Sequence, residues 1–204
     1  MIVDQDGSGG APNDGDLILA GSPFPDFYGG LANNMSFKNF DLSMFFQFSY
    51  GNEIYNATRS WMENLKLNDR TIIGTNTTQA AFDNRWQQPG DITRYPGVNY
   101  DGRNDNYTLP HTGWLEDGSY LRLKSLTFGY TFDSTLLSKL NLNSARIYLT
   151  ANNLLTFTNY SGFDPEVDHF TGVNGGANSG LLRGYDYGSY PQARSLRIGI
   201  NVTF

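Results

Sequence analysis

The N-terminal stretch Asp4-Gln-Asp6-Gly-Ser8-Gly9 places oxygen-bearing side chains at alternate positions before a glycine. Calcium-binding loops use this spacing, because alternate residues turn their oxygens toward one ion and the glycine makes the sharp turn. The twelfth position of such a loop holds a bidentate glutamate, whereas this chain has Gly15 there. The favoured interpretation is therefore an acidic loop in solvent, with a calcium site at Asp4, Asp6 and Ser8 as the alternative.

Three carboxylates stand at alternate positions later in the chain, at Asp164, Glu166 and Asp168. Glycoside hydrolases use two carboxyl groups on opposite sides of the scissile bond. Alternate acids around a turn do not create that arrangement, so we predict that the chain is not an enzyme. The two histidines, His111 and His169, are expected to be loop residues in solvent. The chain has no cysteine, which excludes thiolate metal sites.

Three tryptophans, Trp61, Trp86 and Trp114, lie within residues 52–118, a stretch without sustained alternation of apolar and polar residues. A connection of that length seldom lacks a function of its own. Exposed indole rings can stack on the apolar faces of sugars, and buried ones pack loops against each other. Loop packing is the favoured interpretation, and these three residues are the candidates for ligand binding if the loops contact a substrate.

The composition excludes one class of partner and leaves a membrane open. Lys and Arg number 14 against 20 Asp and Glu, so the net charge is −6, and no basic run could follow a phosphate backbone. Nucleic acid is therefore excluded as a partner. No stretch approaches the roughly 18 apolar residues of a membrane-spanning helix, but a membrane barrel strand needs only about 9 to 11 residues of alternating polarity.

Alternation of apolar and polar residues predicts five strands. The first two span 27–37 and 40–50, joined by Lys38-Asn39 as a tight turn. The apolar residues of the third strand, 120–132, change face near Lys124, which predicts a bulge there. The remaining strands are expected at 145–156 and 195–204, and a short helix at 57–67.

The two faces of these strands differ in a way that separates two folds. The polar face carries mostly neutral residues and glycine, as in Ser125, Thr127 and Gly129, and the apolar face carries no charge. The outer face of a soluble sandwich is typically rich in Lys and Glu, whereas a barrel lumen need not be. We predict an all-β fold in which antiparallel strands form part of a large transmembrane β-barrel, with long extracellular loops containing short helices. A soluble glycan-binding β-sandwich is the alternative.

Three stretches of the sequence resemble one family of membrane proteins. They are LEDGSYLRLKSLTFGYTF (115–132), RIYLTANNLLTFTNYSGFDPEV (146–167) and YGSYPQARSLRIGINVTF (187–204). Their residues, order and spacing are similar to the C-terminal part of the SusC/RagA family of TonB-linked outer-membrane transporters. The resemblance implies that residues 1–204 are the C-terminal part of a barrel of about 22 strands, whose plug and earlier strands lie outside this chain.

The resemblance also implies a function and partners. Members import glycans or peptides across the outer membrane of Bacteroidetes-type bacteria, with energy delivered by the TonB complex. A SusD-like lipoprotein covers the outer side, the lipid bilayer surrounds the strands, and no cofactor is implied. Phe204 resembles the terminal aromatic residue by which the barrel-assembly machinery recognises its clients. Five strands are too few to close a barrel, so we expect that the chain alone transports nothing.

Overall fold

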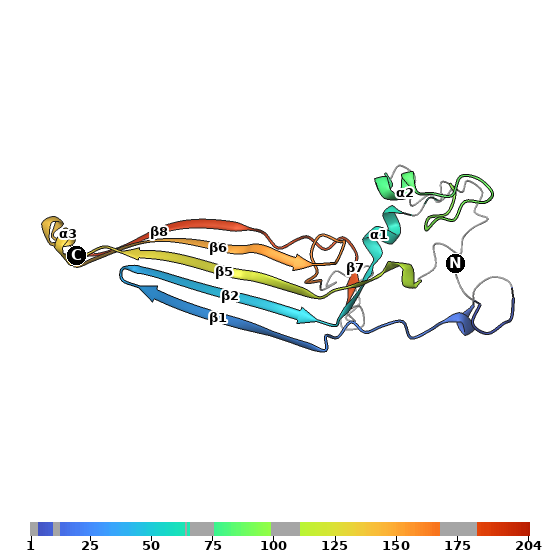
Figure 1. Cartoon of the computed structure of the whole chain (residues 1–204), viewed down its shortest axis with the longest axis horizontal. Helices are drawn as coiled ribbons and strands as arrows, with labels where there is room; N and C mark the ends of the chain where they lie inside the picture. Colours follow the sequence, from blue (N-terminus) through green and yellow to red (C-terminus); the bar gives the residue numbers. More distant parts are fainter. Residues whose placement is uncertain (1–3, 10–12, 64, 66–75, 99–110, 168–182) are drawn as a thin grey trace, which may run out of the picture. The chain divides into compact units, whose positions relative to one another are not determined.

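Five long antiparallel strands form the main sheet of the computed structural model, which describes residues 4–9, 13–63, 65, 76–98, 111–167 and 183–204. The strands lie side by side in the order β1-β2-β5-β6-β8 (Figure 1). All five predicted strands are confirmed, with ends that differ by at most two residues from those expected. Their bounds are β1 Phe27–Phe37, β2 Phe40–Tyr50, β5 Tyr120–Thr131, β6 Ser144–Thr158 and β8 Ser195–Thr203.

The hairpin of β1 and β2 has the two-residue turn that the sequence predicts. Phe37 pairs with Phe40, which leaves only Lys38 and Asn39 between the strands. Lys38 has a φ of 53°, in the left-handed region that tight hairpin turns require. The turn fixes the register of the hairpin, and with it the face on which each side chain lies.

The register places most apolar residues of the five strands on one face, with Phe45 as an exception. Phe128 of β5 pairs with Leu42 of β2 and with Leu149 of β6, and Leu149 pairs in turn with Ile198 of β8. Of these side chains, Phe128, Leu149 and Ile198 are exposed, and Ile198 exposes 72% of its surface. A sandwich would bury this row between two sheets, so the sandwich interpretation is wrong.

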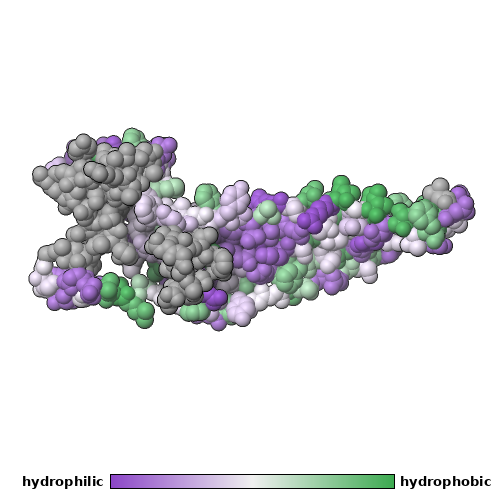
Figure 2. All heavy atoms as spheres, turned by 180° about the vertical axis from the view of Figure 1, so that it is seen from behind, coloured by the Kyte–Doolittle hydropathy of each residue, from purple (hydrophilic) through white to green (hydrophobic). Residues whose placement is uncertain are grey.

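Neutral polar residues line the opposite face and bond across the strands. Thr127 and Thr150 lie with their hydroxyl oxygens 3.1 Å apart, and the Asn152 side chain donates to Ser195 over 3.1 Å. Figure 2 shows hydrophilic residues gathered along the middle of the strands, with hydrophobic residues along both margins. This polar face is the one that a barrel turns toward its lumen.

The predicted bulge is present where β5 and β6 lose their simple register. Leu123 pairs with Leu155 and Ser125 pairs with Asn152, so Lys124 on β5 stands opposite two residues of β6. The irregularity keeps Leu123 beside Phe46 on the apolar face, although the alternation of the sequence would turn it away. It also leaves Arg122 opposite Gln47 on the polar face.

Gly129 makes room for an ion pair that crosses three strands on the polar face. Arg146 of β6 donates to both carboxylate oxygens of Asp41 of β2, at 3.0 and 2.5 Å, and Gly129 of β5 lies beneath them. A Cβ atom at Gly129 would overlap with the carboxylate and the guanidinium. A larger residue at this position would therefore displace the ends of the Asp41 and Arg146 side chains.

Substitution of Gly129 with alanine is expected to lower the free energy of unfolding of the complete transporter by at most about 1 kcal/mol, because the added methyl group displaces a half-exposed ion pair. Urea titration of the purified protein in detergent measures this difference. In an Asp41→Ala background the same substitution is expected to cost less, since the carboxylate that meets the methyl group is gone. Equal costs in both backgrounds contradict the packing explanation.

The chain divides into two compact units. The strand unit consists of Phe24–Glu53, Asp117–Glu166 and Tyr190–Phe204, and the loop unit consists of the described parts of Met1–Pro23, Ile54–Glu116 and Val167–Ser189. Short strands β4 (Leu115–Asp117), β3 (Glu53–Asn56) and β7 (Tyr185–Asp186) form a second sheet in that order. The α-helices are α1 (Ala57–Met62), α2 (Gln79–Asp83) and α3 (Ser134–Leu137), and the 3₁₀ helices are η1 (Asp14–Asp16), η3 (Thr112–Trp114) and η4 (Ser138–Leu140).

Helix α1 confirms the expected helix at 57–67 in its first half, but it ends at Met62 with Glu63 as its C-cap, and Leu65 is not helical. Residues 64, 66 and 67 lie outside the described residues. Asn56 caps it by accepting a hydrogen bond from the Arg59 N–H over 2.9 Å. Ala81, Tyr95 and Trp114 form a small buried cluster in the loop unit, against which Tyr55 packs. No helix in the described ranges combines the length and the apolar character needed to cross a membrane.

Candidate functional site

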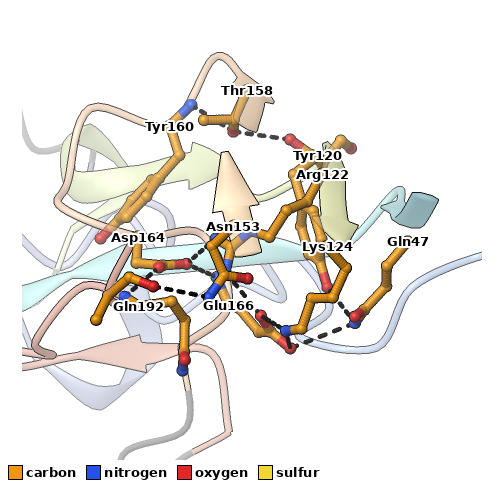
Figure 3. Close-up of polar contacts among 12 residues, drawn as sticks. Gln47, Tyr120, Arg122, Lys124, Asn153, Thr158, Tyr160, Asp164, Glu166 and Gln192 are labelled. Carbon is orange, nitrogen blue, oxygen red and sulfur yellow. Dashed lines mark hydrogen bonds and ion pairs between the residues drawn. The ribbon is translucent and has the colours of Figure 1, made fainter. Parts of the chain in front are cut away.

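A group of charged and polar side chains lies on the polar face, where β2 and β6 end and β5 and β8 begin (Figure 3). Arg122 binds the carboxylates of Asp164 and Glu166, the second with an N–O distance of 2.9 Å. Lys124 lies 3.0 Å from Glu166. We call this group, which consists of Gln47, Tyr120, Arg122, Lys124, Asp164 and Glu166, the Arg122 cluster.

The cluster has a buried half and a half-exposed half. Arg122 exposes 2% of its surface and Asp164 exposes 5%. Lys124 and Glu166 each expose about a third of their side chains, at 32% and 31%. Gln47 joins the exposed half by donating to the Tyr120 hydroxyl over 2.9 Å and to Glu166 over 3.3 Å. The cluster therefore has a rigid base and a rim that solvent reaches.

The geometry of Asp164 and Glu166 is that of ion-pair partners. Both carboxylates bind the same guanidinium, and the Glu166 backbone N–H donates to Asp164 over 2.9 Å. A glycosidase pair instead flanks an open space that receives the substrate bond. Asp168 lies outside the described residues. The arrangement thus gives no support to hydrolysis at these acids.

A second charged network lies inside the loop unit. Arg59 of α1 contacts Glu63 and Glu116, each with an N–O distance of 2.9 Å. Thr78 and Tyr95 both donate to the other oxygen of Glu63, over 3.1 and 3.3 Å. Burial alone would lower the pKa of Arg59, but its bonds to Glu63, Tyr95 and Glu116 outweigh that effect and raise the pKa. The network joins α1, the start of α2 and the strand that follows η3.

The three candidate tryptophans have different surroundings. Trp114 exposes 1% of its surface and packs with Arg59, whose guanidinium carbon lies 5.5 Å from the ring centroid. It has no free ring face, so the structure supports the packing interpretation for Trp114 and not stacking on a sugar. Trp61 and Trp86 are exposed. Trp61 meets Tyr187 edge-on, with ring centroids 5.8 Å apart.

The acidic N-terminal loop adds a further carboxylate to two residues of the predicted set. Carboxylate oxygens of Asp4, Asp6 and Asp16 lie within 4.8 Å of one another, and the Ser8 N–H donates to Asp6 over 2.9 Å. Asp4 accepts hydrogen bonds from the Gly7 and Gly9 N–H groups, over 2.6 and 3.0 Å.

Hydrogen bonds from Ser8 lower the pKa of Asp6. The carboxylates of this loop therefore already have backbone donors, as an acidic loop in solvent would, and the calcium site stays a prediction.

Comparison with known proteins places this architecture in a family. No family model matches the chain. TonB-dependent receptor P3 of Formosa agariphila is 37% identical over 204 residues, which are 100% of this chain and 19% of that protein. TonB-dependent receptor SusC of Bacteroides thetaiotaomicron is 25% identical over 205 residues, 100% of this chain and 17% of SusC.

A solved structure agrees with these sequence matches. The RagAB peptide importer in its open-open state superposes with a TM-score of 0.68 at 26% identity, covering 95% of this chain and 20% of the importer chain. The chain is a segment of a SusC/RagA-type TonB-dependent transporter. It spans about a fifth of the length of the relatives that it matches.

Membership of the SusC/RagA type locates the segment in the outer membrane of a Bacteroidetes bacterium. It also accounts for the open sheet, because a part of a barrel has two free strand edges, here β1 and β8, that the rest of the barrel completes. The relatives named above are receptors and importers rather than enzymes. The SusC/RagA segment thus presents an apolar face to lipid and a polar face to the lumen.

His111 differs from its expected role as a loop histidine in solvent. It is half-buried and precedes η3, where its Nδ1 atom accepts a hydrogen bond from the Gly113 N–H over 3.1 Å. Burial lowers the pKa of His111, because the charged imidazolium loses hydration. His169 lies outside the described residues.

The turn at His111 is expected to loosen as the pH falls. Its pKa is lower in the folded protein than in the unfolded chain, where it is about 6.5, so the stabilisation is complete above that pH and is lost as the pH falls through the folded pKa. The protection factor of the Gly113 amide, which is its intrinsic exchange rate divided by the observed rate at the same pH, is expected to fall at the acid end of a series measured between pH 5 and pH 8. A His111→Asn substitution keeps an acceptor without titrating, and its exchange should lack this acid-induced opening; an unchanged pH profile contradicts the role of His111.

Proposed function

We propose that this segment belongs to an active importer that brings nutrients, glycans or peptides, across the outer membrane with energy from the TonB complex. The observation that carries the proposal is the amphipathic sheet, apolar on one face and polar on the other, in a chain whose full length is similar to part of TonB-dependent receptors. A barrel with these faces provides a polar route through lipid. Import is not chemistry on the substrate, so the proposal includes no catalytic residue and no required cofactor.

The proposal includes partners for the complete protein. The similarity to SusC and to the RagAB peptide importer supports this part of the proposal, because the name RagAB denotes an assembly of two components. We propose that a SusD-like lipoprotein covers the outer side of the complete transporter and that the TonB complex binds a part outside residues 1–204. Residues 1–204 are proposed to be the C-terminal part of the barrel, with Phe204 as the signal read by the barrel-assembly machinery.

Trp61 and Trp86 remain the proposed contacts of the loop unit with substrate. Their exposed rings offer apolar faces to a sugar or to a peptide side chain. Trp114 is left out of this proposal because its ring is buried.

The experiment is deletion of the gene for the complete transporter in its host, followed by uptake measurements with labelled oligosaccharides and labelled peptides. The expected result is loss of uptake of one of these two classes, restored by the intact gene and not by the same gene in a strain without TonB. Copurification with the intact transporter is expected to recover a lipoprotein. Uptake of both classes that is unaffected by deletion contradicts the proposal.

A further inference from the structure

The segment that follows β6 lies over the polar face of the strand unit. The Tyr160 N–H donates to the Thr158 hydroxyl over 3.1 Å at the end of β6, and six residues further along, Glu166 reaches Arg122 and Lys124 of β5. Because Arg122 pairs with Gln47 on the polar face, this contact places the segment on that side of the sheet (Figure 3).

Asp164 connects three parts of the chain through one carboxylate. Its Oδ1 atom binds Arg122 of β5 and accepts from the Glu166 N–H over 2.9 Å, and its Oδ2 atom accepts from the Gln192 N–H over 2.9 Å. Gln192 belongs to the segment that leads into β8. The neighbouring Ala193 carbonyl accepts from the Asn153 side chain over 3.0 Å. The segments after β6 and before β8 are thus fixed to the same strands.

Burial distinguishes this ion pair from the other one on the same face. Arg122 and Asp164 expose 2% and 6% of their side chains, whereas Arg146 and Asp41 expose 30% and 37%. A half-exposed pair between strands contributes little, and a buried pair is costly to break because the remaining charge has no water. Arg146 and Asp41 connect strand to strand, and Arg122 and Asp164 connect strand to loop.

We propose that Arg122 and Asp164 are positioning residues for import. They hold residues 159–166 and 190–194 against the polar face, and so present Lys124 and Glu166 to a substrate that moves along that face. Without the buried pair, Glu166 loses one of its two cationic partners, and the segment after β6 is free to leave the sheet. The inference rests on the proposed function for its role in import, but the loop position itself can be measured without transport.

The test uses a single cysteine as a reporter of the loop position in the complete transporter. Pro165 lies between Asp164 and Glu166 and is buried, so a cysteine there is reached only when the segment leaves the sheet, and this chain has no cysteine of its own. Pro165→Cys is introduced in a transporter whose cysteines outside these residues, where present, are changed to serine. Labelling of intact cells with a membrane-impermeant maleimide then gives the rate at which the segment is reached.

Arg122→Gln is expected to raise the labelling rate about tenfold, because the segment spends more time away from the sheet. The matched control is Arg146→Gln, which removes the other Arg–Asp pair of the same face and is expected to leave the rate within about twofold of the parent. An unchanged rate in Arg122→Gln at a normal outer-membrane level, or an equal rise in both variants, overturns the proposal.

A second variant keeps the test decisive if Arg122→Gln does not assemble. Asp164→Asn leaves Arg122 with Glu166 but weakens the bonds to the segment before β8, and it is expected to raise the labelling rate in the same direction. Uptake measured on the same cells is expected to show a higher half-saturation concentration with a nearly unchanged maximal rate per receptor. A wild-type transporter that imports nothing refutes the proposed function, whereas unchanged labelling of the variants refutes the positioning role.

Discussion

Replacement of Met44 with arginine is expected to reduce the amount of assembled transporter in the outer membrane at least tenfold. Met44 is in the middle of β2 on the apolar face, paired with Leu126 of β5, which pairs in turn with Ala151 of β6. An arginine that faces lipid near the bilayer midplane costs about 2 to 4 kcal/mol. The fraction that keeps the compact, heat-modifiable form in unheated gel samples of outer membranes measures the effect.

The control is the residue next to Met44 in the same strand. Ser43 lies on the polar face, where its hydroxyl donates to Asn34 over 2.6 Å, and it is exposed. Ser43→Arg adds the same charge to the same strand, but it places the guanidinium in a polar lumen beside Asp41, so assembly is expected to stay near the wild-type level. Equal losses in the two variants, or a larger loss for Ser43→Arg, contradict the assignment of the faces.

The strand unit could be predicted from the sequence because its information is local. Each strand alternates with period two, and the turn at Lys38-Asn39 sets the register of the first hairpin without help from distant residues. The bulge at Lys124 could also be predicted, because the apolar residues of the sequence change from one face to the other there. The motifs in three of these strands also resemble the SusC/RagA family, and this resemblance explains why the sheet has free edges.

The loop unit could not be predicted in the same way because its contacts join residues far apart in the chain. Arg59 pairs with Glu116, which lies 57 residues later in the sequence, and no spacing pattern in the sequence predicts that pair. The sequence pattern did not identify Asp16, because a calcium-binding loop that begins at Asp4 has ligands only at fixed positions up to residue 15. Asp16 comes close to Asp4 because the chain turns back at η1. The burial of Trp114 follows from its packing with Ala81 and Tyr95, which no periodic pattern reveals.

The two units therefore achieve order by different means. The strand unit is a regular ladder whose apolar face needs lipid, and polar contacts between its strands add to the backbone hydrogen bonds of the ladder. The loop unit has few regular elements and, in its described part, a small apolar cluster of three residues, so it depends on buried charge networks to fix its loops. A change to one of these networks is expected to act locally, without loss of the barrel strands.

Replacement of Arg59 with alanine is expected to open the loop unit. Glu63 is buried and, among the described residues, keeps the hydroxyls of Thr78 and Tyr95 as partners once the guanidinium is gone. Removal of one partner of a buried ion pair costs about 3 to 5 kcal/mol, because the remaining charge is left without compensation. Hydrogen–deuterium exchange of the complete transporter is expected to show at least about a 100-fold loss of protection in peptides that cover α1 and η3, since each 1.4 kcal/mol changes an opening equilibrium tenfold.

The matched control for Arg59 is Arg94, in the same unit. Arg94 is exposed, its guanidinium donates to the Gly113 carbonyl over 2.6 Å, and no buried acid of the described part of the chain pairs with it. Arg94→Ala is expected to change protection less than tenfold, because loss of this side chain leaves no buried charge without its partner. Glu63→Gln in the Arg59→Ala background removes the stranded charge and is expected to restore part of the protection. If this double variant opens as far as Arg59→Ala alone, the buried carboxylate is not the cause, and lost packing of Arg59 on Trp114 explains the opening instead.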